Sequence, residues 1–311
     1  MSPSPFQIHV PATTANLGPG FDILGIALDV GTNLAFRFEG DHYQLFDVAG
    51  AAIPIPPEKN LIAKAYERVL LASEVAPAPW TAVVESDLLP GRGFGSSAMA
   101  LVAGVILANE QLNALGKNAW TLQQQIALLC EMEGHPDNVI PARVGGWICS
   151  LPQGQYARRN LPDHFGIQIL IPEKQTSTNE SRVQLPKQYS LEDCVTNLRG
   201  LAAWFDYIDS GNGESLKVAL QCDRLHEPYR TPQIPGFQEI RNTAMEAGCL
   251  GSSLSGSGPG LAVFFDRNQV AESGLQRISD LAVSYGYTSR ICGINNQGAR
   301  KITSSQKEVQ R

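Results

Sequence analysis

The sequence predicts an α+β protein with room for two domains. Segments typical of strands precede and follow segments typical of helices in an irregular order along the chain. The 311 residues are enough for two domains of ordinary size, each with its own core. Hydrophobic residues make up 43% of the chain and charged residues 17%, which is typical of a globular protein and not of a disordered one.

Charge and cysteine content narrow the class of partner. The net charge of −6 and the lack of Lys/Arg runs argue against nucleic acid as the main partner. Residues 1–10 lack a basic region followed by an apolar core, and no apolar run reaches about 18 residues, so we expect a cytoplasmic protein without a membrane span. The six cysteines include no CxxC pair, which favours reduced thiols over a zinc site or a disulfide framework.

The first elements are expected to be strands, followed by one helix. Residues 6–10 predict the first strand, and the alternating stretches 33–38 and 43–48 predict antiparallel strands. Residues 60–72 carry apolar side chains at helical spacing and predict an amphipathic helix. Asn60 suits the N-cap of that helix, a role that requires no ligand.

The middle of the chain alternates between buried segments and turns. Branched residues predict a strand over 81–89, and the apolar stretch 97–114 predicts a buried helix. Thr121 and Gly134 suit the two ends of a further helix over 121–133. Residues 145–151 are typical of a buried strand.

A division between the two domains is expected near residue 160. The turn-rich stretch 152–162 is the best candidate for a linker, which gives domains 1–160 and 161–311. Beyond it we expect a strand over 165–172, a helix over 191–208 and a strand over 261–265.

A glycine loop connects the expected strand 81–89 to the buried helix that follows. Gly91, Gly93 and Gly95 allow positive φ and close approach of a ligand, and Ser96 or Ser97 could cap the helix. Free N–H groups and the helix dipole would then favour a phosphate. The loop is neither a Walker A sequence, since no Lys precedes the serines, nor the dinucleotide fingerprint. A tight strand-to-helix connection remains the alternative interpretation.

Three further groups of residues are candidates for binding. Asn16 and Asp22 flank a Gly-Pro-Gly bend, which is either a surface loop or a site for a small polar ligand. Arg182 and Arg230 present paired donors that suit a carboxylate, although either could be a surface arginine. The segment 251–260 is rich in Gly and Ser, and it allows another backbone or a nucleotide to lie against it.

The densest cluster of polar functional groups lies at the end of the helix 121–133. Within eight residues it offers Glu131, Glu133, His135, Asp137 and Asn138. Acidic groups at a helix C-terminus oppose the helix dipole. Because the cluster costs stability there, we favour a functional site over a solvated helix end.

Segments 11–22, 90–98 and 253–259 together resemble the three motifs of the GHMP kinase superfamily, which phosphorylates small metabolites from ATP. The middle segment matches the superfamily's P-x-x-G-L-G-S-S-A loop, with Phe94 in place of Leu. The resemblance implies an N-terminal domain like ribosomal protein S5 domain 2, a C-terminal α/β sandwich, and a site between them.

Within the superfamily the chain is most similar to the homoserine kinases. Residues 10–22 resemble their first motif, without the Lys that mevalonate kinases typically carry there, and residues 131–139 and 227–230 resemble two further segments. The resemblance implies phosphoryl transfer from ATP to L-homoserine in threonine biosynthesis, and it is compatible with a homodimer. Another kinase of the superfamily and a catalytically inactive binding protein are the alternatives.

The resemblance also implies roles for individual residues. The ATP phosphates would lie on the loop of Pro90, Gly91, Arg92, Gly93, Phe94, Gly95, Ser96, Ser97 and Ala98. Asn60 would approach the adenine, and Ser97 and Glu131 would ligate Mg²⁺, with Glu131 preferred to Glu133.

For the acceptor, the resemblance implies that Arg182 and Arg230 bind the homoserine carboxylate. Its amino and hydroxyl groups would be surrounded by Asn16, Asp22, His135 and Asp137. Related enzymes use an Asp base where Asn138 stands, and an amide cannot accept the hydroxyl proton at neutral pH. The implied catalysis is therefore in-line transfer helped by positioning, with Asp22, Asp137 and Asn138 as the catalytic residues.

Overall fold

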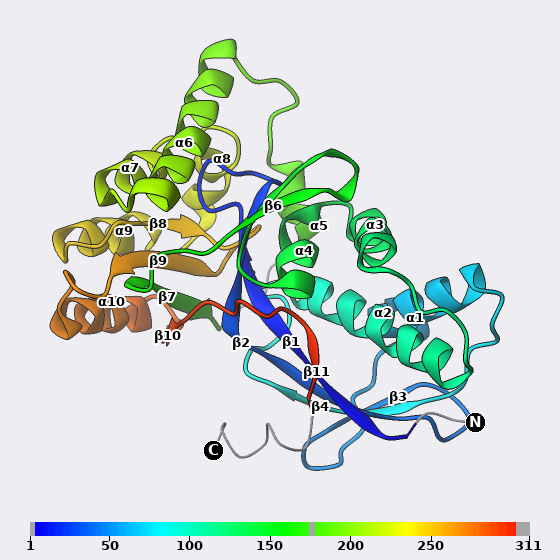
Figure 1. The fold of residues 1–311 in the computed structure, drawn as a ribbon. Helices are drawn as coiled ribbons and strands as arrows, with labels where there is room; N and C mark the ends of the chain where they lie inside the picture. Colours follow the sequence, from blue (N-terminus) through cyan, green and yellow to red (C-terminus); the bar gives the residue numbers. More distant parts are fainter. Residues whose placement is uncertain (1–3, 174–177, 303–311) are drawn as a thin grey trace.

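The computed structural model describes residues 4–173 and 178–302, which form two β-sheets flanked by helices (Figure 1). The first sheet contains β1 (Phe6–Ala15), β2 (Leu24–Arg37), β3 (Gln44–Asp47), β4 (Thr81–Ser86), β5 (Trp147–Ser150), β6 (Tyr156–Arg159) and β11 (Arg300–Ile302). Its order is β11-β1-β2-β4-β3, with β5 paired to β2 and β6 to β5. The second sheet contains β7 (Phe165–Pro172), β8 (Gly251–Leu254), β9 (Leu261–Asp266) and β10 (Tyr287–Cys292), in the order β10-β7-β9-β8.

The helices form two successive groups along the chain. The first sheet is covered by α1 (Leu61–Ala72), α2 (Ser96–Ala114), α3 (Leu122–Glu133) and α4 (Pro136–Val144) (Figure 1). The helices that follow are α5 (Thr178–Val183), α6 (Leu191–Ser210), α7 (Gly213–Ala219), α8 (Glu227–Arg230), α9 (Phe237–Glu246) and α10 (Glu272–Ser284). This arrangement of mixed sheets and helices confirms the predicted α+β class.

Helix boundaries with a clear local signal are confirmed. The side chain of Asn60 accepts the Ala63 N–H at 3.0 Å and caps α1. Thr121 and Gln124 form a reciprocal capping box at the start of α3, and Gly134 ends that helix with positive φ.

The pairing of β3 differs from the prediction. β3 lies parallel to β4, with Leu45 opposite Ala82, and does not pair with β2. Alternation along a strand identifies its two faces but not its neighbour, so the antiparallel prediction was wrong. The chain between β3 and β4 contains α1, the kind of crossover that a parallel pair requires.

Three segments extend the first sheet beyond the expected strands. β1 continues past residue 10 to Ala15, with a register shift in its pairing with β2 between Pro11 and Thr13. The expected linker 152–162 contains β6, which pairs with β5. β11 returns from the C-terminal part of the chain to pair with β1, so a division at residue 160 assigns this strand to the wrong sheet.

One hydrophobic cluster extends across both sheets, and another packs the C-terminal helices on the second sheet. Trp204 of α6 lies 6.3 Å from the Trp147 ring of β5 and 5.9 Å from the Phe264 ring of β9, measured between centroids. The Trp204 indole also donates to the Leu17 carbonyl at 2.9 Å. α6 therefore fixes the polar turn after β1 against both domains, and this turn carries part of the site described next.

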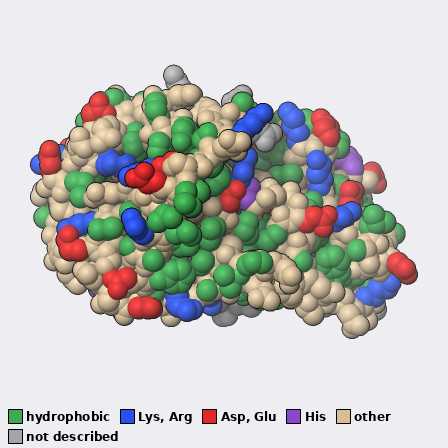
Figure 2. Space-filling model, turned by 90° about the horizontal axis from the view of Figure 1, so that it is seen from above, with side chains coloured by type: hydrophobic (Ala, Val, Ile, Leu, Met, Phe, Trp, Pro, Cys, Tyr) green, Lys and Arg blue, Asp and Glu red, His purple; other side chains and the backbone are tan. Residues whose placement is uncertain are grey.

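On the face in Figure 2, Lys and Arg side chains are interspersed with Asp and Glu side chains. None of the helices in the described ranges combines the length and apolarity needed to cross a bilayer.

Candidate active site

The three motif segments meet at one pocket between the two sheets. The Thr13 N–H donates to the Phe94 carbonyl at 3.2 Å, and the Gly256 N–H donates to the Ala15 carbonyl at 3.1 Å. The Ser255 hydroxyl donates to the Gly93 carbonyl at 2.6 Å. The turn after β1, the glycine loop and the loop after β8 are thus joined by hydrogen bonds around the pocket.

The glycine loop places an uncapped helix N-terminus in the pocket. Gly95, at φ 72°, is the N-cap of α2, and no side chain caps the helix, so the predicted serine cap was wrong. The first helical hydrogen bond runs from the Met99 N–H to the Gly95 carbonyl, which leaves the N–H groups of Ser96 to Ala98 outside the helical ladder. Gly93, Gly95, Ser96 and Ser97 line the pocket, as an anion site of this kind requires.

A side chain at position 95 would collide with the neighbouring strand. A Cβ on Gly95 would lie 2.1 Å from Thr13 Oγ1 and 3.1 Å from Asn138 Oδ1. The positive φ of this residue is a second reason for glycine. The close contact keeps the start of α2 directly beside β1 and α4.

The acidic side chain that faces the glycine loop is Glu133, and not Glu131. Glu133 Oε2 accepts from the Ser97 hydroxyl at 2.6 Å, and its side chain is 10% exposed. Glu131 is 63% exposed, lies outside the pocket and pairs with Arg68 at 2.7 Å. The choice of Glu131 as metal ligand is therefore corrected: two residues along a helix turn a side chain by roughly 200°.

The donor set at Ser97 and Glu133 fits a divalent cation. A hydroxyl and a carboxylate are the hard oxygen ligands that Mg²⁺ takes. Burial raises the pKa of Glu133, outweighing the lowering effects of the Ser97 hydrogen bond and the charge of His135. A buried carboxylate of this kind gains from a cation beside it.

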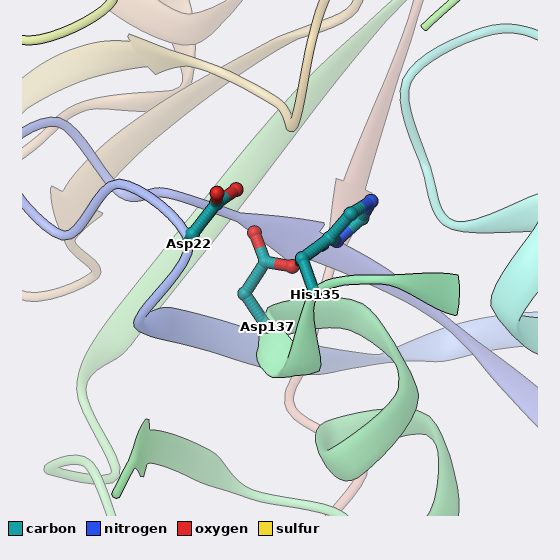
Figure 3. Close-up of side chains that lie close together, drawn as sticks. All are labelled: Asp22, His135 and Asp137. Carbon is teal, nitrogen blue, oxygen red and sulfur yellow. Dashed lines mark hydrogen bonds and ion pairs between the residues drawn. The ribbon is translucent and has the colours of Figure 1, made fainter. Parts of the chain in front are cut away.

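His135, Asp137 and Asp22 form a second polar cluster in the pocket (Figure 3), and His135 Nε2 lies 4.0 Å from Glu133 Oε1. His135 is the N-cap of α4, and Asp137 lies in its first turn, where a negative charge is favourable. His135 Nδ1 and Asp137 Oδ1 are 2.6 Å apart, and one ligand atom of each of the three side chains lies within 4.8 Å of the others. The residues of the polar cluster that follow Gly134 therefore lie at the start of α4, where a negative charge stabilises the helix.

The cluster favours the charged form of His135. Burial lowers the pKa of this imidazole, but the hydrogen bond to Asp137 and the charges of Asp137, Glu133 and Asp22 together raise it above its ordinary value of 6.5. The imidazole can therefore orient and partly neutralise the Asp137 carboxylate around neutral pH.

Asn138 is oriented by a residue that the sequence did not single out. The Thr13 hydroxyl donates to Asn138 Oδ1 at 2.7 Å. The Asn138 amide nitrogen then remains as the group that can donate, and it lies 3.4 Å from Asp137 Oδ1. Thr13 stands inside the resembling segment 11–22, which was the available signal for it.

Two guanidinium groups share an aromatic platform at the mouth of the pocket. The Arg182 and Arg230 guanidinium carbons lie 5.7 and 5.4 Å from the Phe21 ring centroid. The His226 ring stacks on Phe21 at 5.3 Å. Both arginines line the pocket, so neither is an ordinary surface arginine.

The two arginines differ in their partners. Arg182 forms a bidentate ion pair with Asp22, at 2.7 and 3.1 Å. Arg230 is only 3% exposed, and within the described residues no carboxylate lies within 4.0 Å of it. A buried guanidinium without a carboxylate favours an anionic ligand.

Asn16 holds the pocket wall together. Its Oδ1 accepts the Asp22 N–H at 3.0 Å, and its Nδ2 donates to the Gly256 carbonyl at 2.7 Å. Asn16 lines the pocket, but both polar atoms of its side chain are engaged in fixing the turn that carries Asp22.

Several residues assigned to ATP lie outside the pocket lining. The Asn60 side chain caps α1, which is the structural interpretation already given for it, and it does not line the pocket. The remaining loop residues outside the lining are Pro90, Arg92, Phe94 and Ala98. Phe94 and Ala98 are buried in the core, so they support the loop from behind.

The fold and the three joined motif segments define the class of protein as an ATP-dependent small-molecule kinase. The GHMP kinases N terminal domain family matches residues 60–146, and the GHMP kinases C terminal family matches residues 205–283. Homoserine kinases of Prochlorococcus marinus (strain MIT 9515) and Synechococcus sp. (strain RCC307) are both 38% identical, over 84% and 82% of each chain.

Solved structures give the same result. A homoserine kinase from Cytophaga hutchinsonii matches with a TM-score of 0.81 at 25% identity, covering 96% of this chain and 97% of the other. A putative homoserine kinase from Listeria monocytogenes matches at 0.77 and 28% identity, covering 97% of this chain and 100% of the other. The chain belongs to the GHMP kinase family, in its homoserine kinase branch.

Proposed function

We propose that this protein transfers the γ-phosphoryl group of ATP to the hydroxyl of L-homoserine, giving O-phospho-L-homoserine and ADP on the route to threonine. Family membership and the printed names of the relatives support the reaction. One observation carries the proposal: a single pocket combines an uncapped helix N-terminus with two guanidinium groups and a cluster of carboxylates.

The ATP phosphates bind at the glycine loop. The N–H groups at the start of α2 and the helix dipole hold the phosphate oxygens. Ser97 and Glu133 would hold Mg²⁺, which would neutralise phosphate charge when bound. The tight packing of Gly93 and Gly95 against their neighbours keeps these donors fixed before the nucleotide arrives.

The amino-acid acceptor binds between the arginines and the acidic cluster. Arg230 and Arg182 bind its carboxylate, for which paired guanidinium donors are suited. Asp22 and Asp137 accept from its ammonium group, and His135 holds Asp137 in place through their 2.6 Å contact.

The hydroxyl attacks without a side-chain base beside it at position 138. The Asn138 amide cannot take a proton at neutral pH. Because Thr13 occupies Asn138 Oδ1, the amide nitrogen is the group available to hold an oxygen. Catalysis then rests on the alignment of the hydroxyl with the terminal phosphate, which Asn138, Asp137 and Asp22 provide. The new O–P bond forms as the bond from the γ-phosphorus to the β–γ bridging oxygen breaks, ADP leaves, and the hydroxyl proton passes to an oxygen of the transferred phosphoryl group.

A coupled assay of ADP release tests the proposal. We expect turnover with L-homoserine and none with mevalonate or L-threonine. Turnover with mevalonate instead would favour another kinase of this family, and ATP binding without any turnover would favour an inactive binding protein. Analytical ultracentrifugation tests the homodimer with which the family resemblance is compatible.

A further inference from the structure

Arg182 and Asp22, which the proposed function assigns to the carboxylate and the ammonium group of the amino acid, bind each other. Arg182 NH2 donates to Asp22 Oδ1 at 2.7 Å, and Arg182 NH1 donates to Asp22 Oδ2 at 3.1 Å. These are the bonds that Arg182 would make to a substrate carboxylate. The same Asp22 oxygens would accept from the ammonium group.

The pair can open without unfolding its surroundings. Asp22 lies in the turn after β1 and Arg182 in α5, so the contact joins two elements 160 residues apart. The side chains are 33% and 39% exposed, and the pair is thus accessible from solvent. An exposed pair of this kind contributes little stability, which makes it suitable for exchange.

We infer that the Asp22–Arg182 ion pair makes the acceptor site select zwitterions. This inference rests on the proposed function and adds the basis of its substrate choice. An α-amino acid replaces the one internal pair with two new pairs, carboxylate to Arg182 and ammonium to Asp22. An alcohol that carries only one of the two charges breaks the internal pair and replaces only half of it.

Each stranded group would face a neighbour of its own charge. A ligand with only a carboxylate leaves Asp22 without its guanidinium partner beside Asp137, and the one imidazole of the cluster, His135, already pairs with Asp137 at 2.6 Å. A ligand with only an ammonium leaves Arg182 unpaired next to Arg230, whose pKa is lowered by burial and then by the charge of Arg182. Like charges held this close are unfavourable, so both ligands bind at a cost.

The test compares binding of three ligands to matched variants. The ligands are L-homoserine, 4-hydroxybutanoate, which lacks the ammonium group, and 3-aminopropan-1-ol, which lacks the carboxylate. The variants are Asp22→Asn, which frees Arg182, and Arg182→Gln, which frees Asp22. Asn tolerates the positive φ of position 22, so the first change keeps the turn. Isothermal titration calorimetry gives each Kd.

A matched control is available outside the pocket. Asp87 and Arg290 form an ion pair at 2.9 Å with side-chain exposures of 40% and 44%, similar to those of the Asp22–Arg182 pair. Neither residue lines the pocket. Asp87→Asn is expected to leave all three Kd values unchanged.

The inference predicts that each variant binds one of the two singly charged ligands more tightly, and that the two variants differ in which ligand this is. Asp22→Asn is expected to bind 4-hydroxybutanoate about fivefold more tightly than the parent chain. This factor corresponds to the free energy that a partly exposed ion pair contributes. The same variant is expected to bind L-homoserine at least about tenfold more weakly, because an ionic hydrogen bond is lost. Arg182→Gln is expected to tighten 3-aminopropan-1-ol instead.

Two results together overturn the inference. In the first, Asp22→Asn binds 4-hydroxybutanoate no more tightly than the parent chain does. In the second, Arg182→Gln binds 3-aminopropan-1-ol no more tightly than the parent chain does. The two variants are independent, so misfolding of one, detected by its melting curve, leaves the other to decide. Failure of the proposed function is a separate result: the parent chain would then release no ADP with L-homoserine, whatever the Kd values are.

Discussion

Exchanging each of two glutamates of α3 for glutamine distinguishes the proposed metal ligand from its neighbour. Glu133 faces Ser97 across a 2.6 Å hydrogen bond, whereas Glu131 pairs with Arg68 outside the pocket. Glu133→Gln removes one carboxylate from the proposed Mg²⁺ site. Glu131→Gln removes the same charge from the same helix without touching that site, so the second variant is a matched control.

The structure sets the size of both effects. Loss of one group that stabilises the transition state costs about 10²–10³ in kcat, and we expect that loss for Glu133→Gln. For Glu131→Gln we expect an unchanged kcat and a change in unfolding free energy within about 0.5 kcal/mol, because its ion pair is exposed.

Stability distinguishes a lost ligand from a damaged fold. Burial raises the pKa of Glu133, so its charge opposes folding at neutral pH. The neutral glutamine relieves that cost and can still accept from Ser97. We therefore expect the melting temperature of Glu133→Gln without Mg²⁺ to equal or exceed that of the parent chain.

The measurements are coupled ADP release over a Mg²⁺ titration and thermal unfolding in EDTA. The expected pattern is a low kcat and a higher Mg²⁺ requirement for Glu133→Gln alone. If Glu131→Gln loses activity equally, or if Glu133→Gln keeps it, the assignment of the metal site is refuted.

Three further predictions follow from the pocket. Arg230→Leu should raise KM for L-homoserine far more than KM for ATP in steady-state kinetics, because the buried guanidinium faces the acceptor. His135 has a raised pKa in the folded protein, so its ion pair with Asp137 stabilises fully below pH 6.5 and is lost as pH rises through the folded value. His135→Gln should flatten that part of the pH profile of unfolding free energy measured in EDTA. Gly95→Ala should reduce ATP binding in calorimetry and lower the melting temperature, because its Cβ would lie 2.1 Å from Thr13 Oγ1 at a positive φ.

Each of these predictions has an opposing result. Equal KM increases for both substrates would remove Arg230 from the acceptor site. A pH profile that His135→Gln leaves unchanged would contradict the Asp137 pairing as the source of the raised pKa. Parent-like ATP affinity of Gly95→Ala would show that the loop tolerates a displaced start of α2.

Many elements of the fold could be predicted from residues that are close together in the sequence. The cap at Thr121, the cap at Asn60 and the strand over 165–172 depend on local geometry, and the structure confirms them. The same holds for the glycine loop, since positive φ and a following helix are properties of neighbouring residues.

The choice between the two glutamates could not be made from sequence. Both stand at the end of α3, and only the orientation of that helix against α2 turns Glu133 toward Ser97. Thr13 and Phe21 were inside a recognised segment, but their partners Asn138 and Arg182 lie more than a hundred residues away. Such contacts have no local signal.

The sequence by itself determined the α+β class through short-range periodicity, and the family through the resemblance of its motif segments. It also named the residues that we propose for a phosphate site and an acceptor site. Only the tertiary structure decided the partner of β3, the return of β11 to the first sheet, and the pairing of Asp22 with Arg182. The physical reason is the same in each case. Packing of the shared core fixes which distant side chains come into contact, and their spacing along the sequence does not predict that contact.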